Sequence, residues 1–176
     1  ARLPRLQEIY NLDHGQLGLV LLAGSIGALV AMPLTGKVIV KTGSHRITVV
    51  MLFLFCLFVP LIPVTPNIYT LWIILFAIGA TSCSLDVAMN AQAVLVEQRL
   101  RKPVMSSFHA IFSAGMMLGA GSGALFTYFE VSFFLHLLII MAVSLLVASR
   151  VRHFLIPDLR KVGQEQANQP SQTLLV

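Results

Sequence analysis

Charged residues are scarce in this sequence: aspartate, glutamate, lysine and arginine make up 11% of its 176 residues, whereas they make up roughly 25% of an ordinary soluble domain. Hydrophobic residues make up 57%. Such a chain lacks the polar surface that a soluble fold needs, so we interpret it as a membrane protein. A secretory signal peptide does not explain the composition, because the apolar residues recur along the chain instead of preceding a polar domain.

Cysteines and catalytic motifs are also few. The two cysteines, Cys56 and Cys83, fall inside apolar stretches, where a buried free thiol is usual and a structural disulfide is not expected. No residues have metal-ligand spacing, and the sequence contains no HExxH, no GxSxG and no phosphate-binding glycine loop. With no nucleophile and no metal site to point to, we expect a protein that is not an enzyme and needs no cofactor or metal.

Five apolar stretches approach or exceed the roughly 20 helical residues that cross a hydrocarbon core. They cover residues 15–36, 47–65, 68–98, 104–128 and 131–149. The sequence thus predicts an all-α fold, a polytopic bundle of five membrane-spanning helices over residues 15–156. We expect residues 1–14 to form an external segment and residues 157–176 to form a polar cytoplasmic tail, the start of a central linker.

Lysine and arginine follow the alternation of the predicted connections, since ten of the 12 come after the first, third and fifth apolar stretches. They are Lys37, Lys41, Arg46, Arg99, Arg101, Lys102, Arg150, Arg152, Arg160 and Lys161. Basic residues accumulate on the cytoplasmic side of membrane proteins. We therefore expect the N-terminal segment outside and the C-terminal tail inside. The net charge of +5 follows from this asymmetry, so anionic lipid headgroups account for it and no nucleic-acid partner is needed.

The two ends of the sequence suggest a fragment. The first residue is Ala1, placed outside the membrane by the orientation above, with no cleavable signal before it. One earlier helix, absent from the sequence, would bring the N terminus back inside. The bundle would then have six helices instead of five. The final "LLV" of residues 174–176 could begin another apolar segment. We therefore expect the chain to be part of a longer protein.

Small residues at a spacing of four recur in two of the predicted helices. They are Ala23, Gly27 and Ala31 in the first, and Gly115, Gly119 and Gly123 in the fourth. In lipid, close helix contact depends on such smooth faces, so we expect both stripes to mediate helix packing. The alternative is a face that slides or rocks against another bundle during transport.

The segment "GKVIVKTGSHR" joins the first two predicted helices. Its glycines and basic residues are Gly36, Lys41, Gly43, His45 and Arg46. In this spacing they resemble the signature loop between the second and third helices of the major facilitator superfamily, a gating loop in that family. Val40 stands at the acidic position of the pattern and Ser44 at a usually basic one. A basic cytoplasmic turn would explain the lysines equally well, although it would not explain both glycines.

Four further segments resemble the fucose-permease-like branch of that superfamily: "ARLPRL", "GLVLLAGSIGALVAMPLTG", "SLDVAMNAQAVLVE" and "SSFHAIFSAGMMLGAG". The third has an acid followed four positions later by asparagine, as Asp86 and Asn90 are, and the fourth has a polar residue at His109 that faces the substrate in that branch. The resemblance implies the N-terminal half of a twelve-helix transporter in the plasma membrane, the inner membrane of a bacterium. Its missing first helix and its C-terminal half would be the partners of this chain.

Asp86 is the acid that the apolar surroundings explain least. A carboxylate at the bilayer centre costs about 2.5–3.5 kcal/mol even on permissive scales, so Asp86 should face protein or water. Ser82 and Asn90 lie on the same helical stripe, and we expect His109 and Ser113 of the next helix to reach the same cavity. The alternative for these polar residues is a purely structural role, a hydrogen bond to a nearby backbone carbonyl.

We expect no special function for two other ionisable residues, Glu97 and His136. Glu97 comes just before the basic residues at 99–102, so we expect a solvated ion pair there. His136 falls near the outer end of the fifth predicted helix, where an interfacial histidine needs no special role.

The sequence and the resemblance together lead us to expect a secondary active transporter. Its ligands would be protons and a small polar solute such as a sugar, moved by alternating access, with Asp86 exchanging the proton. Removal from water favours the protonated form of a carboxylic acid, which suits that role. The alternative is a non-transporting membrane scaffold or an inactive half-transporter, in which the polar stripe only fixes helix order.

Overall fold

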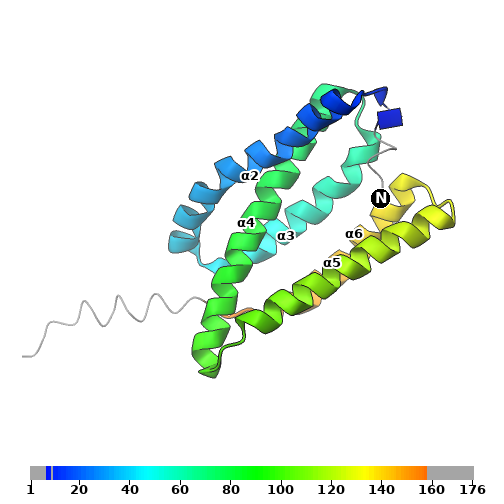
Figure 1. Ribbon diagram of the computed structural model, residues 1–176. Coiled ribbons are helices and arrows are strands. Elements are labelled where there is room, and N and C mark those ends of the chain that lie inside the picture. The colour runs from blue at the N-terminus through cyan, green and yellow to red at the C-terminus, as the bar shows by residue number, and fades with distance from the viewer. Residues whose placement is uncertain (1–6, 9, 158–176) are drawn as a thin grey trace, which may run out of the picture.

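The computed structural model describes residues 7–8 and 10–157, which form long helices joined by short connections (Figure 1). The helices are α2 (His14–Thr42), α3 (Ser44–Phe58), the 3₁₀ helix η1 (Val59–Val64), α4 (Ile68–Leu100), α5 (Met105–Tyr128), α6 (Phe133–Val151) and the 3₁₀ helix η2 (Arg152–Phe154). Counting η1 with α3 and η2 with α6, five are long and apolar enough to cross a membrane. The predicted all-α bundle of five spans is confirmed.

Polar side chains cap the first turns of three helices. Asp13 accepts a hydrogen bond from the backbone N–H of Gln16 at 2.7 Å, and the Gln16 side chain accepts one from the Asp13 N–H at 3.0 Å. Asn67 caps α4 by accepting from the Thr70 N–H, and Ser132 caps α6 by accepting from the Leu135 N–H. These residues accept from N–H groups that have no partner within the helix, and they set starts within two residues of the predicted ones.

The connection expected over residues 36–46 is almost entirely helical. α2 continues to Thr42 and α3 begins at Ser44, so Gly43 is the single residue between them. Gly43 has a φ of 89°, a conformation that glycine adopts without a steric penalty. The prediction of a loop was wrong, because a helix can continue beyond the hydrocarbon core while its lysines reach water.

The second membrane-spanning segment changes from α-helix to 3₁₀ helix at its C-terminal end. α3 stops at Phe58, and the chain continues as the 3₁₀ helix η1, which contains Pro60 and Pro63. Proline lacks the N–H that an α-helical hydrogen bond requires, so the regular helix is not maintained through this segment. The apolar stretch predicted as one helix is therefore two.

The tightest contact joins α2 to α4. The face of α2 that is buried against α4 consists of Val20, Ala23, Gly27, Ala31 and Thr35, which includes the small-residue stripe expected from the sequence. A Cβ on Gly27 would overlap the backbone of Phe76, and a Cβ on Gly79 would overlap the backbone of Gly24. Glycine therefore permits the backbones to touch, which is how helices associate in lipid.

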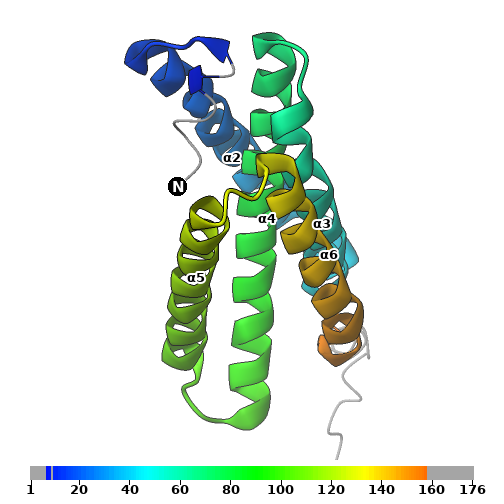
Figure 2. The ribbon, with the colours of Figure 1, turned by 90° about the vertical axis from the view of Figure 1, so that its right-hand side faces the viewer.

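Helix α5 diverges from α4 in one view and lies apart from α6 in the other (Figures 1 and 2). Every residue from 106 to 121 is exposed among the described residues. A Cβ on Gly115 or Gly119 would meet nothing within 4 Å, whereas Gly123 is buried. The small-residue face of α5 is thus open around Gly115 and Gly119 among the described residues and covered only at Gly123.

The connections that carry basic residues share one end of the bundle. The α2–α3 junction, the turn between α4 and α5 and the end of α6 lie toward the same end of the bundle in both views (Figures 1 and 2). The starts of α2, α4 and α6 lie at the other. At that second end the Tyr10 hydroxyl donates to the carbonyl oxygen of Thr65 at 2.7 Å. The lysines and arginines of three connections therefore gather on one side.

Candidate functional site

Asp86 lies within α4, 18 residues after its start and 14 before its end. Its side chain is exposed among the described residues, as is that of Ser82. The side-chain amide of Asn90 donates to the Asp86 backbone carbonyl at 3.0 Å and approaches the carboxylate oxygen Oδ1 at 3.4 Å. The three residues form one polar stripe on α4, on a face that neither α2 nor α3 covers.

His109 and Ser113 lie on α5 and are exposed. The Ser113 hydroxyl donates to the backbone carbonyl of His109 at 2.9 Å, which is the usual contact of a serine in a membrane helix. Both hydrogen bonds between Asn90 and Asp86 stay within α4. Among the described residues, His109 is therefore not joined to the polar stripe of α4.

The hydrogen bonds of Glu97 set the register of α5 against α4. Its carboxylate oxygen Oε2 accepts from the backbone N–H groups of Val104 at 3.0 Å and Met105 at 3.1 Å. With this register and about 1.5 Å per residue, His109 lies about 6 Å beyond the Glu97 level, and Asn90 lies about 10 Å beyond it. Ser113 is level with Asn90, and His109 is roughly one turn nearer the end of the bundle. α5 also diverges from α4 beyond their shared turn (Figure 1).

The role expected for Glu97 was wrong. It is half-buried and binds the start of α5 instead of pairing with Arg99 or Lys102. Arg101, with a φ of 53°, turns the chain so that the first N–H groups of α5 face the carboxylate. A negative charge is favoured there, because these N–H groups have no helical partner and the helix dipole is positive at that end.

The residues of the resembled gating loop occupy three kinds of position. Gly36 and Lys41 are exposed on α2, Gly43 forms the break, and Arg46 is exposed on the first turn of α3. Ser44, at a position that is usually basic in the pattern, is fully buried. The Ser44 carbonyl accepts from the Thr48 hydroxyl at 2.9 Å.

His136 also differs from its expectation. It is buried, and its ring stacks on Phe126 of α5 with centroids 4.5 Å apart and an angle of 24° between the planes. The stack joins the far end of α5 to the start of α6. The sequence contained no signal for it beyond the presence of an aromatic ring on each side of a short turn.

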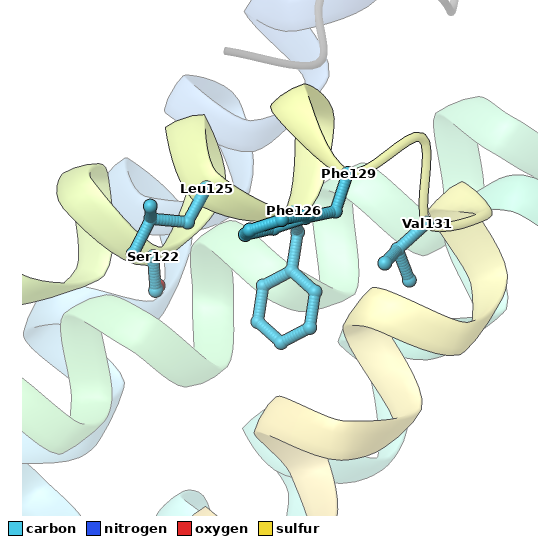
Figure 3. A pocket seen from close by; sticks show the side chains of 5 residues that line it. All are labelled: Ser122, Leu125, Phe126, Phe129 and Val131. Carbon is cyan, nitrogen blue, oxygen red and sulfur yellow. The ribbon is translucent and has the colours of Figure 1, made fainter.

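An apolar pocket of about 360 Å³ lies beside this stack (Figure 3). Its lining is Ser122, Leu125, Phe126, Phe129 and Val131. Its lining includes none of the residues predicted to bind the solute or to exchange the proton. Within the described part of the chain, no group of three histidine, cysteine, aspartate or glutamate side chains could hold a metal ion.

Comparison with known families gives a match along nearly the whole sequence. Residues 3–174 match the Major Facilitator Superfamily. The chain belongs to this superfamily. The family expected from the signature segments is confirmed, whereas the fucose-permease-like branch and a missing first helix stay predictions. Membership agrees with a multi-pass membrane protein of the transporter class, which the five apolar helices also indicate.

Several curated relatives resemble this major facilitator chain. An uncharacterized transporter of Sinorhizobium fredii, y4wD, is 34% identical over 139 residues, which are 79% of this chain and 37% of that protein. An uncharacterized MFS-type transporter of Yersinia pestis is 39% identical over 118 residues, 67% of this chain and 31% of that protein. The membrane protein MosC of Rhizobium meliloti is 31% identical over 117 residues, 66% of this chain and 29% of that protein. The matched segment thus spans about a third of each relative, and no solved structure matches the chain.

Proposed function

We propose that this chain contributes to a secondary active transporter that moves a small polar solute, such as a sugar, by alternating access and couples that movement to protons. The single observation that carries the proposal is Asp86, an exposed acid about 21 Å from the nearer end of a membrane-spanning helix. An ionisable residue in the middle third of a membrane-spanning helix is expensive, and its usual use in membrane proteins is functional.

The neighbours of Asp86 support a polar solute. Ser82 and Asn90 on α4 and Ser113 on α5 offer hydroxyl and amide groups to hydrogen-bond sugar hydroxyls, and His109 is a further candidate one turn away. None of them is an apolar recognition group. The relatives named as transporters extend well beyond the matched segment, so the complete site would include residues outside this chain, such as those of a second half across the cavity.

The orientation proposed for this transporter follows its charge distribution. The basic end of the bundle faces the cytoplasm of a bacterial cell, and the end with Asn11 and Thr65 faces outward. Cysteines introduced at Asn11 and Thr65 would then react with an impermeant reagent added outside intact cells, and a cysteine at Thr42 would not. External labelling at Thr42 would show that the orientation is the opposite of the one proposed.

The substitution Asp86→Asn in the complete protein tests the coupling. The amide keeps the shape and the hydrogen bonding of the carboxyl group but cannot carry a proton. In proteoliposomes with a trapped pH-sensitive dye, supplied in turn with neutral monosaccharides, the parent should show sugar-dependent proton uptake and accumulation. Asp86→Asn should retain sugar exchange and lose both. Asp13→Asn, which changes an acid at the start of α2, should behave like the parent.

The alternative is a scaffold or an inactive half-transporter, in which Asp86 only fixes helix order. The contact of its carboxylate with the Asn90 amide, at 3.4 Å, stays within α4, so a scaffold role would need a further partner on another helix. Accumulation by Asp86→Asn equal to that of the parent, with the same pH dependence, would show that Asp86 carries no coupled proton. Absence of transport by the parent with every solute of the panel would favour the scaffold.

A further inference from the structure

Gln92 makes a set of hydrogen bonds that the proposed transport does not use. It lies on α4, and its side chain is 6% exposed. Its amide nitrogen Nε2 donates to the Ser44 hydroxyl at 2.7 Å and to the Ile156 backbone carbonyl at 2.9 Å. Its amide oxygen Oε1 accepts from the Ile156 backbone N–H at 2.9 Å.

One side chain therefore joins three segments that are far apart in the sequence. Ser44 begins α3 directly after the break at Gly43, Gln92 belongs to α4, and Ile156 follows the end of α6 and η2. The two bonds to Ile156 engage both its N–H and its C=O, as a neighbouring strand would in a sheet. The preceding residue, Leu155, has an extended backbone with ψ of 138°. Gln92 thus recognises extended backbone and not the isoleucine side chain.

Among the described residues, the segment that leaves α6 has little apolar burial. Phe154 is 83% exposed, Leu155 and Ile156 are only half-buried and Pro157 is exposed. Apolar burial contributes correspondingly little to its attachment. A buried amide without hydrogen-bond partners is unfavourable. The arrangement in which Gln92 bonds to Ile156 is therefore preferred while residues 155–157 lie against it. All three segments meet at the basic end of the bundle, where water can replace these bonds if the segment moves.

We propose that Gln92 is a clasp that holds residues 155–157 against α3 and α4 and that can open to release them. Closed, it fixes the position from which the chain continues past α6. Open, it leaves the Gln92 amide to bond with water. The clasp depends on the geometry of the bundle and not on which solute is carried, so it goes beyond the proposed function.

The rate at which Ile156→Cys reacts with a water-soluble maleimide tests the clasp. The thiol replaces only the side chain, so both backbone bonds to Gln92 remain possible. In the complete protein, without other cysteines and in inside-out vesicles, Gln92→Glu should raise this rate by about tenfold or more, because the carboxylate cannot donate to Ile156 or to Ser44. Gln98→Glu, the same change on the exposed side of α4, should leave the rate unchanged.

A second variant guards against misfolding of the first. Gln92→Met has nearly the same length and no charge, so it should keep the fold while removing all three bonds, and it should raise the labelling rate to the same extent. Folding of each variant is checked by its thermal midpoint in detergent. If folded Gln92→Met and Gln92→Glu both label at the rate of the Gln98→Glu control, Gln92 is not the clasp.

Discussion

Thr35 of α2 and Ser84 of α4 share a hydrogen bond of 2.7 Å inside the closest helix contact of the bundle. Both side chains are buried. The Thr35 hydroxyl also donates to the Ala31 carbonyl at 2.8 Å, so the Ser84 hydroxyl is left to donate to Thr35. The pair fixes the register of two helices whose backbones meet closely at Gly24, Gly27 and Gly79.

This pair predicts a measurable coupling between two substitutions. Thr35→Val and Ser84→Ala should each lower the stability of the protein in detergent, and the double variant should lose less than the sum. The coupling energy should be about 0.6–2 kcal/mol, the range of hydrogen bonds between membrane helices. Ser122→Ala, which removes a bond within α5 only, should be additive with either. Strict additivity of Thr35→Val and Ser84→Ala would mean that the pair does not hold the helices together.

The glycines of the bundle predict a contrast between two helices. Gly27→Ala and Gly79→Ala place a methyl group against the backbone of the facing helix, so α2 and α4 must separate. We expect a loss of stability of about 1–3 kcal/mol or more for each, seen as a lower thermal midpoint. Gly115→Ala meets nothing within 4 Å in the described chain and favours the helix by its higher propensity, so it should not lower the midpoint. Equal effects at Gly79 and Gly115 would contradict the contact.

The number, type and approximate bounds of the helices could be predicted because the apolar stretches and their capping residues are local signals. The stripe around Gly27 was predictable for the same reason, since a spacing of four on one helix is a local pattern. The end of α2 was not predictable, because nothing in the stretch from Gly36 to Thr42 distinguishes a solvated helix from a loop. Only the φ of Gly43 marks the break.

The candidate site was predictable along one helix and not between helices. Ser82, Asp86 and Asn90 share a stripe because a single helix fixes their spacing. The expected meeting with His109 required the register of α5 against α4, which depends on Glu97 accepting from the Val104 and Met105 N–H groups. Since that carboxylate is followed closely by basic residues, charge alone pointed to the wrong partner. The bonds of Gln92 were not predictable for a similar reason, because its partner Ile156 is 64 residues away.

Glu97 predicts a local change in hydrogen exchange. In Glu97→Gln the amide can still accept from Val104 and Met105, but the bonds lose their charge assistance and their attraction to the helix N-terminus. The amide hydrogens of Val104 and Met105 should then exchange faster by about threefold or more, and after Glu97→Ala by about tenfold or more. Glu130→Gln, at an exposed acid of the α5–α6 turn, is the matched control and should not affect them. Unchanged exchange in Glu97→Ala would show that the carboxylate does not hold the start of α5.

The exposure of Asp86 predicts which side of α4 meets water in the complete protein. A cysteine reacts with a water-soluble thiosulfonate only as the thiolate, which forms where water is present. Asp86→Cys and Asn90→Cys should therefore react, since their stripe is proposed to line the transport cavity. Leu29, 71% exposed on the side of α2 away from α4, is the control, because its exposed surface should contact lipid or another apolar helix. Leu29→Cys should react at least about tenfold more slowly, as a thiol without water stays protonated. Equal, slow reaction at all three positions would place the Asp86 stripe in a dry environment and remove the cavity on which the proposed proton exchange depends.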